Sequence, residues 1–262
     1  MNLNLLIIEG NNPKDSEVFI RAAKASCSEN LKNIVLKLEP SSKITIINPV
    51  NDDETNKALE NMDQYNGVIF TGGAMRLNDM SDEIKKHINF AANCFKHKNK
   101  ILAICWGLQV CSTAAGGKVA PGKNGVHIGI ATDVEINEDG KNNPIYKNKK
   151  LKFNTPAFNF DEVCELPKGA TLLASDKVNK NMGVYFKSGN SEIWGLQYHP
   201  DYEYWQMINL SNERMGKMIA KEYFKDEKMF KKHIDFIKSE EKSLDFKNKT
   251  YEIQNWLDII KN

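Results

Sequence analysis

The sequence has few cysteines, and their arrangement excludes two common uses of this residue. The five cysteines are an odd, scattered set without a Cys-x-x-Cys pair: Cys27, Cys94, Cys105, Cys111 and Cys164. Disulfide frameworks and structural zinc sites use cysteines in even sets or at short, regular spacings. The pattern therefore predicts reduced thiols in a cytoplasmic protein, with neither a disulfide framework nor a zinc site.

Long apolar runs are also absent. The stretch from Leu3 to Ile8 is too short for the hydrophobic region of a signal peptide, and Glu9 follows it at once. No other stretch approaches the roughly 20 apolar residues that a membrane-spanning helix needs. We therefore expect no membrane partner and a cytoplasmic location.

The chain carries no excess of charge of one sign, since 36 Lys and Arg residues face 34 Asp and Glu residues. A net charge of +2 predicts no nucleic-acid partner and no anionic membrane surface. A phosphate-binding loop is lacking as well. Residues 117–123 have its glycine and lysine spacing, but Asn124 stands where the loop needs Ser or Thr, and the segment follows a helical pattern.

What the chain does have is an alternation of short apolar runs and helical periodicity in its first half. The runs 3–8, 43–47, 67–71 and 101–104 predict buried strands, and the segments 14–26, 82–97 and 106–115 predict helices. Strands alternating with helices predict a mostly parallel sheet with helices on both faces. Ligands bind such sheets beyond the carboxyl ends of the strands.

The pattern changes after Gly116. Strand-like segments separated by turn residues predict hairpins that extend or cover the sheet: 125–136, 171–174, 183–187 and 192–197. Residues 202–224 have a helical pattern. Residues 225–262 are highly charged with scattered apolar positions, which predicts a helical extension docked on the domain 1–224 through Trp256 and Leu257.

The chemistry-bearing residues follow two predicted strands. Cys105 ends the run 101–104, Gly107 comes two residues later, and a helical pattern starts at once. This order is typical of a strand-turn-helix elbow, which projects a nucleophile toward the positive end of the helix. His199 and Asp201 follow the later strand and supply a base and an orienting acid.

Several segments together resemble class I (triad-type) glutamine amidotransferases over roughly residues 1–205. Those that carry the resemblance are Ile-Cys-Trp-Gly-Leu-Gln at 104–109, Gln-Tyr-His-Pro-Asp at 197–201, Phe-Thr-Gly-Gly at 70–73, Gly-Gly-Lys-Val at 116–119, and Asp-Glu-Val at 161–163 with Leu-Pro-Lys-Gly-Ala at 166–170. The resemblance implies an α/β, flavodoxin-like, doubly wound and mostly parallel sheet. The hairpins and the C-terminal helical extension are then additions to it.

The resemblance also implies roles for residues of this chain. Cys105, His199 and Asp201 form the catalytic triad, although the family more often has glutamate at the last position. The backbone N–H groups of Gly73 and Trp106 form the oxyanion hole. Gly72 and Gln109 bind substrate, and no metal or organic cofactor is needed. Two further departures from the family pattern are Ala103, where glycine is usual, and Asn159, where histidine is common.

The implied reaction is hydrolysis of the γ-carboxamide of glutamine through a γ-glutamyl thioester, which releases ammonia for a separate synthase subunit. The alternative is a free-standing hydrolase of γ-glutamyl amides or peptides, in which the charged extension covers the site or forms a homodimer contact. A non-catalytic relative that binds a ligand or partner is a third interpretation. A deglycase or peptidase on a similar fold is disfavoured, because those relatives place histidine directly after the nucleophile, where Trp106 stands.

Overall fold

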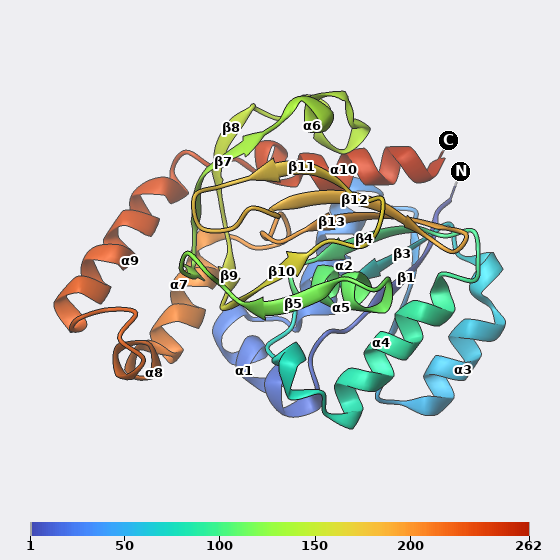
Figure 1. Ribbon diagram of the computed structural model, residues 1–262, viewed down its shortest axis with the longest axis horizontal. Coiled ribbons are helices and arrows are strands. Elements are labelled where there is room, and N and C mark those ends of the chain that lie inside the picture. Colours follow the sequence, from blue (N-terminus) through green and yellow to red (C-terminus); the bar gives the residue numbers. More distant parts are fainter. Residues whose placement is uncertain (1, 262) are drawn as a thin grey trace.

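A nine-stranded sheet runs through the centre of the protein in the computed structural model, which describes residues 2–261 (Figure 1). The strand order is β2-β1-β3-β4-β13-β12-β11-β7-β8. In that order the strands are β2 (Lys43–Ile47), β1 (Asn4–Ile8), β3 (Gly67–Phe70), β4 (Lys100–Ile104), β13 (Ser191–Leu196), β12 (Gly183–Ser188), β11 (Thr171–Ser175), β7 (Ala131–Ile136) and β8 (Lys152–Thr155). The pairs from β2 to β13 are parallel and those from β13 to β8 antiparallel.

This arrangement confirms the predicted α/β, flavodoxin-like fold with added antiparallel strands. Two small ribbons complete the β-structure, β5 (Lys118–Pro121) with β10 (Asp161–Glu165) and β6 (His127–Ile128) with β9 (Phe158–Asn159). The helices are α1 (Pro13–Ala23), α2 (Cys27–Leu38), α3 (Asp52–Glu60), α4 (Asp82–Cys94), α5 (Trp106–Ala114), α6 (Glu138–Asn142), α7 (Tyr204–Glu213), α8 (Met215–Ala220), α9 (Glu227–Glu241) and α10 (Phe246–Lys261). Short 3-10 turns occupy Met62–Gln64, Leu77–Asp79 and Pro144–Tyr146.

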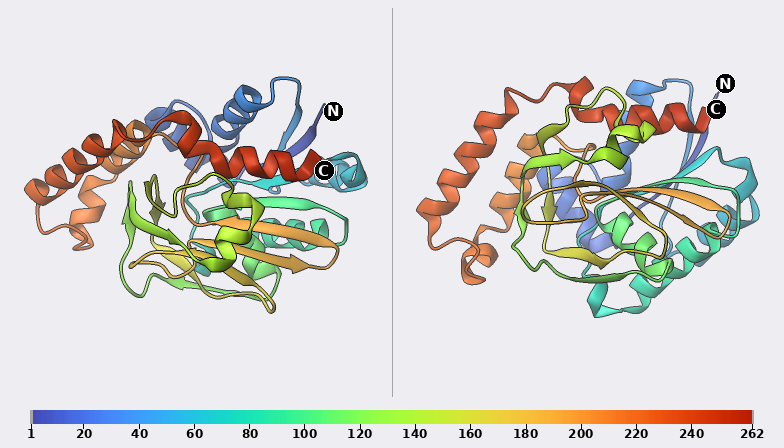
Figure 2. Two further views of the ribbon diagram at one scale, coloured as in Figure 1. Left: turned by 90° about the horizontal axis from the view of Figure 1, so that it is seen from above. Right: turned by 45° about the horizontal axis from the view of Figure 1, so that its top comes forward.

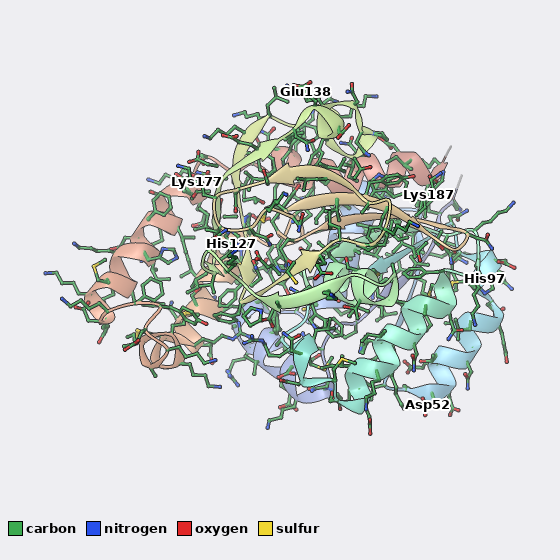
Figure 3. All side chains as sticks on the ribbon, in the orientation of Figure 1. Asp52, His97, His127, Glu138, Lys177 and Lys187 are labelled. Atoms are coloured by element: carbon green, nitrogen blue, oxygen red, sulfur yellow. The ribbon has the colours of Figure 1, made fainter. Side chains whose placement is uncertain are left out.

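The central strands are buried on both faces, as their continuous apolar runs require. Because successive side chains point to opposite faces, β4 sends Leu102 and Ile104 into one core and Ile101 and Ala103 into another. The first core is covered by α2 and α10, and the second by α4 and α5. Charged side chains such as Asp52 and Lys187 lie at the periphery, whereas His127 lies nearer the centre of the view (Figure 3).

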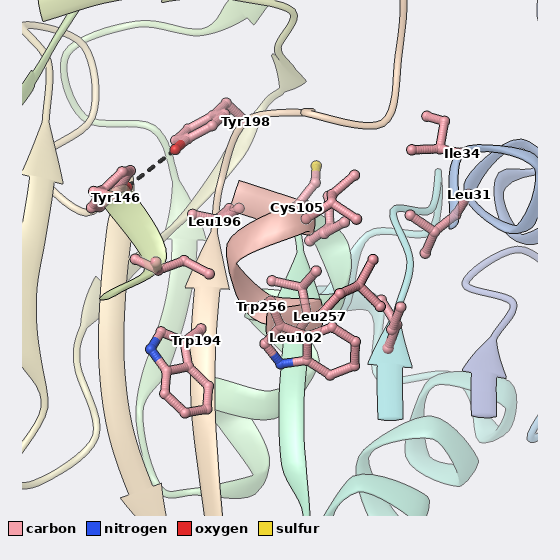
Figure 4. Packing of buried hydrophobic residues seen from close by; sticks show 14 of the residues in the cluster. Leu31, Ile34, Leu102, Cys105, Tyr146, Trp194, Leu196, Tyr198, Trp256 and Leu257 are labelled. Carbon is pink, nitrogen blue, oxygen red and sulfur yellow. Dashed lines mark hydrogen bonds between the residues drawn. The ribbon is translucent and has the colours of Figure 1, made fainter. Parts of the chain in front are cut away.

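The C-terminal extension contributes to these cores. Helix α10 places Trp256 and Leu257, both fully buried, against Leu102 of β4 (Figure 4). Trp256 occupies the space beside Gly67, where an added Cβ would lie 2.6 Å from the indole ring. Helix α9 packs on α7 in a separate cluster (Figure 2).

Three predicted boundaries are wrong, each for a local reason. The predicted helix 14–26 ends at Ala23, because Lys24 adopts a left-handed conformation with φ of 65°. The predicted strand 125–136 is split into β6 and β7 by Gly129, whose φ is +83°. The predicted helix 202–224 is divided at Arg214 into α7 and α8.

Candidate active site

Cys105 lies on the tight turn between β4 and α5, as the sequence predicts. Its φ of 52° and ψ of −108° are unusual for a residue with a side chain, and its N–H donates to the Leu196 carbonyl at 2.6 Å. The following helix approaches β3 so closely that a Cβ on Gly107 would lie 2.4 Å from the Phe70 carbonyl oxygen. Ala103 is fully buried within β4, so the elbow forms without glycine at that position.

Besides the imidazole of His199, the thiol of Cys105 has two polar neighbours. It donates to the Phe158 carbonyl at 3.7 Å, and the side-chain amide of Gln197 donates to Sγ at 3.5 Å. Gln109, one turn into α5, donates to the side-chain oxygen of Gln197 at 3.3 Å and to the Asp161 carbonyl at 2.9 Å. Sequence reasoning singled out Gln109 but missed Gln197, although Gln197 opens the motif that contains His199.

His199 and Asp201 lie just past the end of β13, next to the elbow. The His199 N–H donates to the Pro156 carbonyl at 2.8 Å, which fixes the backbone, and Nδ1 lies 3.0 Å from Asp201 Oδ1. Aspartate therefore spans the distance despite being one methylene shorter than the usual glutamate. Burial lowers the pKa of His199, but the charges and hydrogen bonds of Cys105 and Asp201 outweigh it and raise the pKa to about 10.

The glycine loop after β3 is packed tightly under these groups. A Cβ on Gly72 would lie 2.7 Å from Cε1 of the His199 imidazole. One on Gly73 would lie 2.5 Å from the Gly10 carbonyl oxygen and 3.3 Å from the Trp106 ring. The loop can approach both the base and the elbow only because neither residue has a side chain.

The side chain of Asn159 makes its hydrogen bonds away from Cys105. Its side-chain oxygen lies 2.9 Å from Nδ1 of the buried His127, and its amide nitrogen donates to the Asp161 carbonyl at 3.1 Å. The other imidazole nitrogen of His127 lies 2.8 Å from Asp176. The residue that replaces the family's histidine thus holds β6 and β9 together.

A cavity of about 380 Å³ opens at this site. Among its lining residues are Gly73, Cys105, Trp106, Gln109 and His199. The sequence-predicted residues are therefore brought together, with Gly72 and Asp201 adjoining through His199. Among the described residues 2–261, no group of three or more His, Cys, Asp or Glu side chains could hold a metal ion. In the same part of the chain, none of the helices is both long and apolar enough to cross a membrane.

Comparison with known proteins places this site in a family. A model of the family "Glutamine amidotransferase class-I" matches residues 21–206. The chain belongs to the class-I glutamine amidotransferase family. A glutamine amidotransferase from Thermotoga maritima, superposed over 99% of this chain and 98% of its own, has a TM-score of 0.69 at 17% identity and shares the fold.

Three relatives of this amidotransferase-family chain carry different names. The γ-glutamyl-L-1-hydroxyisopropylamide hydrolase of a Pseudomonas species is 26% identical over 83% of this chain and 74% of its own length. γ-Glutamyl peptidase 5 of Arabidopsis thaliana is 33% identical over 55% of this chain and only 56% of its own length. One subunit of the glutamine-hydrolysing GMP synthase of Methanococcus vannielii is 28% identical over 69% of this chain and 81% of its own. These relatives support an amidohydrolase or amidotransferase enzyme.

Proposed function

We propose that the protein hydrolyses γ-glutamyl amide bonds, with Cys105 as nucleophile. The observation that carries the proposal is Cys105 on its elbow beside an imidazole that Asp201 orients at 3.0 Å. Because the pKa of His199 is raised to about 10, this histidine is protonated at neutral pH. It can therefore stabilise a thiolate and later donate its proton.

The reaction proceeds in two steps. The Cys105 thiolate attacks the γ-carbonyl carbon, and the resulting oxyanion accepts hydrogen bonds from the backbone N–H groups of Gly73 and Trp106. Loss of one such donor typically costs about 3–4 kcal/mol in the transition state. His199 protonates the departing amine, which leaves a γ-glutamyl thioester. His199 then deprotonates a water molecule that attacks the thioester, and glutamate and the thiol are released.

Two uses of this chemistry differ in the leaving group. We propose a free-standing γ-glutamyl amide or peptide hydrolase, because the cavity extends past His199 to Tyr202, Phe19 and Arg214 and has room for an amine larger than ammonia. Likeness to the Pseudomonas hydrolase over 83% of the chain supports this choice. The free state of the five cysteines fits the proposed cytoplasmic location.

The second candidate is the glutaminase that the sequence alone favours, which passes ammonia to a separate synthase. Likeness to the GMP synthase subunit of Methanococcus vannielii over 69% of the chain supports it. The two candidates share their catalytic residues and differ in what the purified protein does by itself. A glutaminase of this kind is expected to depend on its partner, whereas a free-standing hydrolase is not.

The test is glutamate release by the purified protein from glutamine and from a panel of γ-glutamyl amides and dipeptides. We expect faster release from the larger amides, and its loss by at least about a thousandfold in Cys105→Ala. Cys164→Ala is the matched control, because Cys164 is exposed and lies outside the cavity. Release from glutamine alone would favour the glutaminase. No release from any compound would overturn the free-standing hydrolase and leave two candidates, a glutaminase that is silent without its partner and a binding protein that has kept the triad.

A further inference from the structure

Arg214 occupies an unusual position for an arginine. It lies at the junction of α7 and α8 and lines the catalytic cavity. Its guanidinium lies 5.4 Å from the centroid of the Phe19 ring and 5.1 Å from that of Phe158. Burial lowers the pKa of Arg214 and outweighs the opposing attraction of acidic groups that include Asp15 and Glu213. The two rings hold the cation at the cavity wall.

The other arginines at this cavity are paired, and Arg214 is not. Arg76 forms a bidentate ion pair with Asp161, and Arg21 forms one with Glu213 at 2.8 Å. Within residues 2–261, the guanidinium of Arg214 makes neither a hydrogen bond nor an ion pair with any side chain. Asp15 and Glu213, which line the same cavity, attract this partly buried cation only through space, so its hydrogen-bond donors stay available for an anionic group supplied by a ligand.

The position of Arg214 relative to the triad indicates which part of a ligand it meets. His199 protonates the departing amine, so the leaving group lies on the His199 side of the cavity. From His199 the ring of Tyr202 follows edge-on at 5.0 Å, then Phe19 at 6.4 Å from Tyr202, and then Arg214. Gln109 and the Arg76–Asp161 pair also line the cavity and are linked to each other through Asp161.

Phe158 connects this cation to the nucleophile. Its carbonyl accepts from the Cys105 thiol at 3.7 Å, while its ring contacts the Arg214 guanidinium. Phe158 is thus the one residue that lies between the sulfur of Cys105 and the guanidinium of Arg214 along this path. Lys217, one helical turn along α8, lines the same cavity and adds a second positive charge, while the carboxylates there include Glu213, which pairs with Arg21, and Asp15.

We propose that Arg214 binds a carboxylate on the departing amine, so that the preferred substrates are γ-glutamyl amino acids or short γ-glutamyl peptides with a free carboxylate. The planar guanidinium suits a carboxylate because it can donate two parallel hydrogen bonds. This inference rests on the proposed function and narrows its substrate class. It separates this chain from a hydrolase of neutral γ-glutamyl amides.

The experiment compares pairs of substrates that differ only in the charge of the leaving group. The pairs are γ-glutamylglycine with γ-glutamylglycinamide, and γ-glutamylglycylglycine with its C-terminal amide. For the wild-type protein we expect kcat/KM to be about tenfold to a hundredfold higher for the acid in at least one pair. Arg214→Gln should bring that ratio close to one, and Arg214→Lys should keep part of the preference.

Lys231→Gln is the control for charge. It removes the same unit charge from the exposed face of α9, so the acid-to-amide ratio should stay at the wild-type value. Thermal unfolding midpoints of all variants report whether they are folded. Binding of each pair to the inactive Cys105→Ala protein supplies a readout that does not need turnover.

The outcomes separate the inference from the function on which it rests. Hydrolysis of acids and amides at equal rates by the wild-type protein overturns the carboxylate preference and leaves the hydrolase standing. An equal loss on both members of a pair in Arg214→Gln assigns the residue to the glutamyl carboxylate instead, which also overturns the inference. Hydrolysis of neither member, with no binding to Cys105→Ala, removes the proposed function and the inference together.

Discussion

Only one of the two carboxylate oxygens of Asp201 has a hydrogen-bond partner among residues 2–261. Oδ1 contacts the imidazole of His199 at 3.0 Å, whereas Oδ2 is buried and has no hydrogen-bond partner among residues 2–261. A buried carboxylate of this kind is costly unless a nearby cation compensates it. The protonated His199 is that cation, and Asp201 in turn helps to raise the pKa of His199.

The charge of Asp201 leads to a prediction about how kcat/KM depends on pH. The pKa of His199 is about 10 partly because of Asp201, so kcat/KM should fall as the pH rises through that value and the proton for the leaving amine is lost. In Asp201→Asn one cause of the upward shift disappears. The alkaline limb should therefore move to lower pH, and kcat should fall by about a hundredfold to ten-thousandfold. Initial rates of glutamate release between about pH 6 and 11 measure both effects.

Asp82→Asn provides the comparison for this variant. Asp82 is an exposed carboxylate at the start of α4, so its removal changes the net charge equally but leaves His199 untouched. Its pH profile should overlay that of the wild type. An alkaline limb that stays in place in Asp201→Asn would show that Asp201 does not set the proton affinity of His199.

The residues proposed to be catalytic could be singled out in the sequence because each lies beside a local signal. Cys105 stands between an apolar run and Gly107, and His199 directly follows a strand pattern. Gln197 belongs to the motif of His199, but nothing in the sequence indicates its contact with the thiol, and Arg214 has no local signal. The contact of Gln197 with the thiol depends on β13 pairing with β4, and the unpaired state of Arg214 depends on α1 and β9 meeting α7. These are tertiary contacts between segments far apart in the sequence.

At the scale of elements, the strands up to residue 104 were predicted closely, and two helices in the same part of the chain, α2 and α3, were missed. Helix α2 starts at a Ser26 cap and buries Leu31, Ile34 and Val35 at helical spacing, so its pattern was present but lay beyond the overlong helix 14–26. Helix α3 buries only Ala58 and has no apolar stripe. Periodicity could not find it, and its signals are the Asn51 cap and the acidic first turn.

The packing of helix α10 leads to a prediction about the free energy of unfolding of the protein. Trp256 is fully buried between α10 and the sheet, and loss of a buried tryptophan side chain costs about 3–5 kcal/mol. We expect Trp256→Ala to lower the free energy of unfolding by that amount in urea titrations. Trp205→Ala is the matched control, because Trp205 is 38% exposed and should cost about 1 kcal/mol or less. Equal effects of the two variants would contradict the role assigned to α10.

At the scale of the whole molecule, a polar network ties the C-terminal extension to the rest of the fold. Lys149 lies 2.9 Å from Glu252 of α10, and Glu252 accepts from the Tyr198 hydroxyl at 2.6 Å. Lys249 pairs with Glu203, which caps α7 two residues beyond Asp201. The extension is therefore connected by polar contacts to Tyr198 and Glu203, which lie on either side of the segment 199–202. Its predicted role in a homodimer contact stays a prediction.

Because of these contacts, we do not expect the predicted domain 1–224 and the predicted extension 225–262 to fold independently of each other. A fragment 1–224 lacks the side chains that cover one face of the sheet and leaves Glu203 and Lys149 without their buried partners. We expect it to bind the dye ANS, to lose cooperative unfolding and to release no glutamate. A second fragment that ends at residue 242 retains α9 and should behave in the same way, since α10 supplies Trp256. A fragment 1–224 that unfolds cooperatively and stays active would instead show that the amidotransferase fold of this chain is complete without its last two helices.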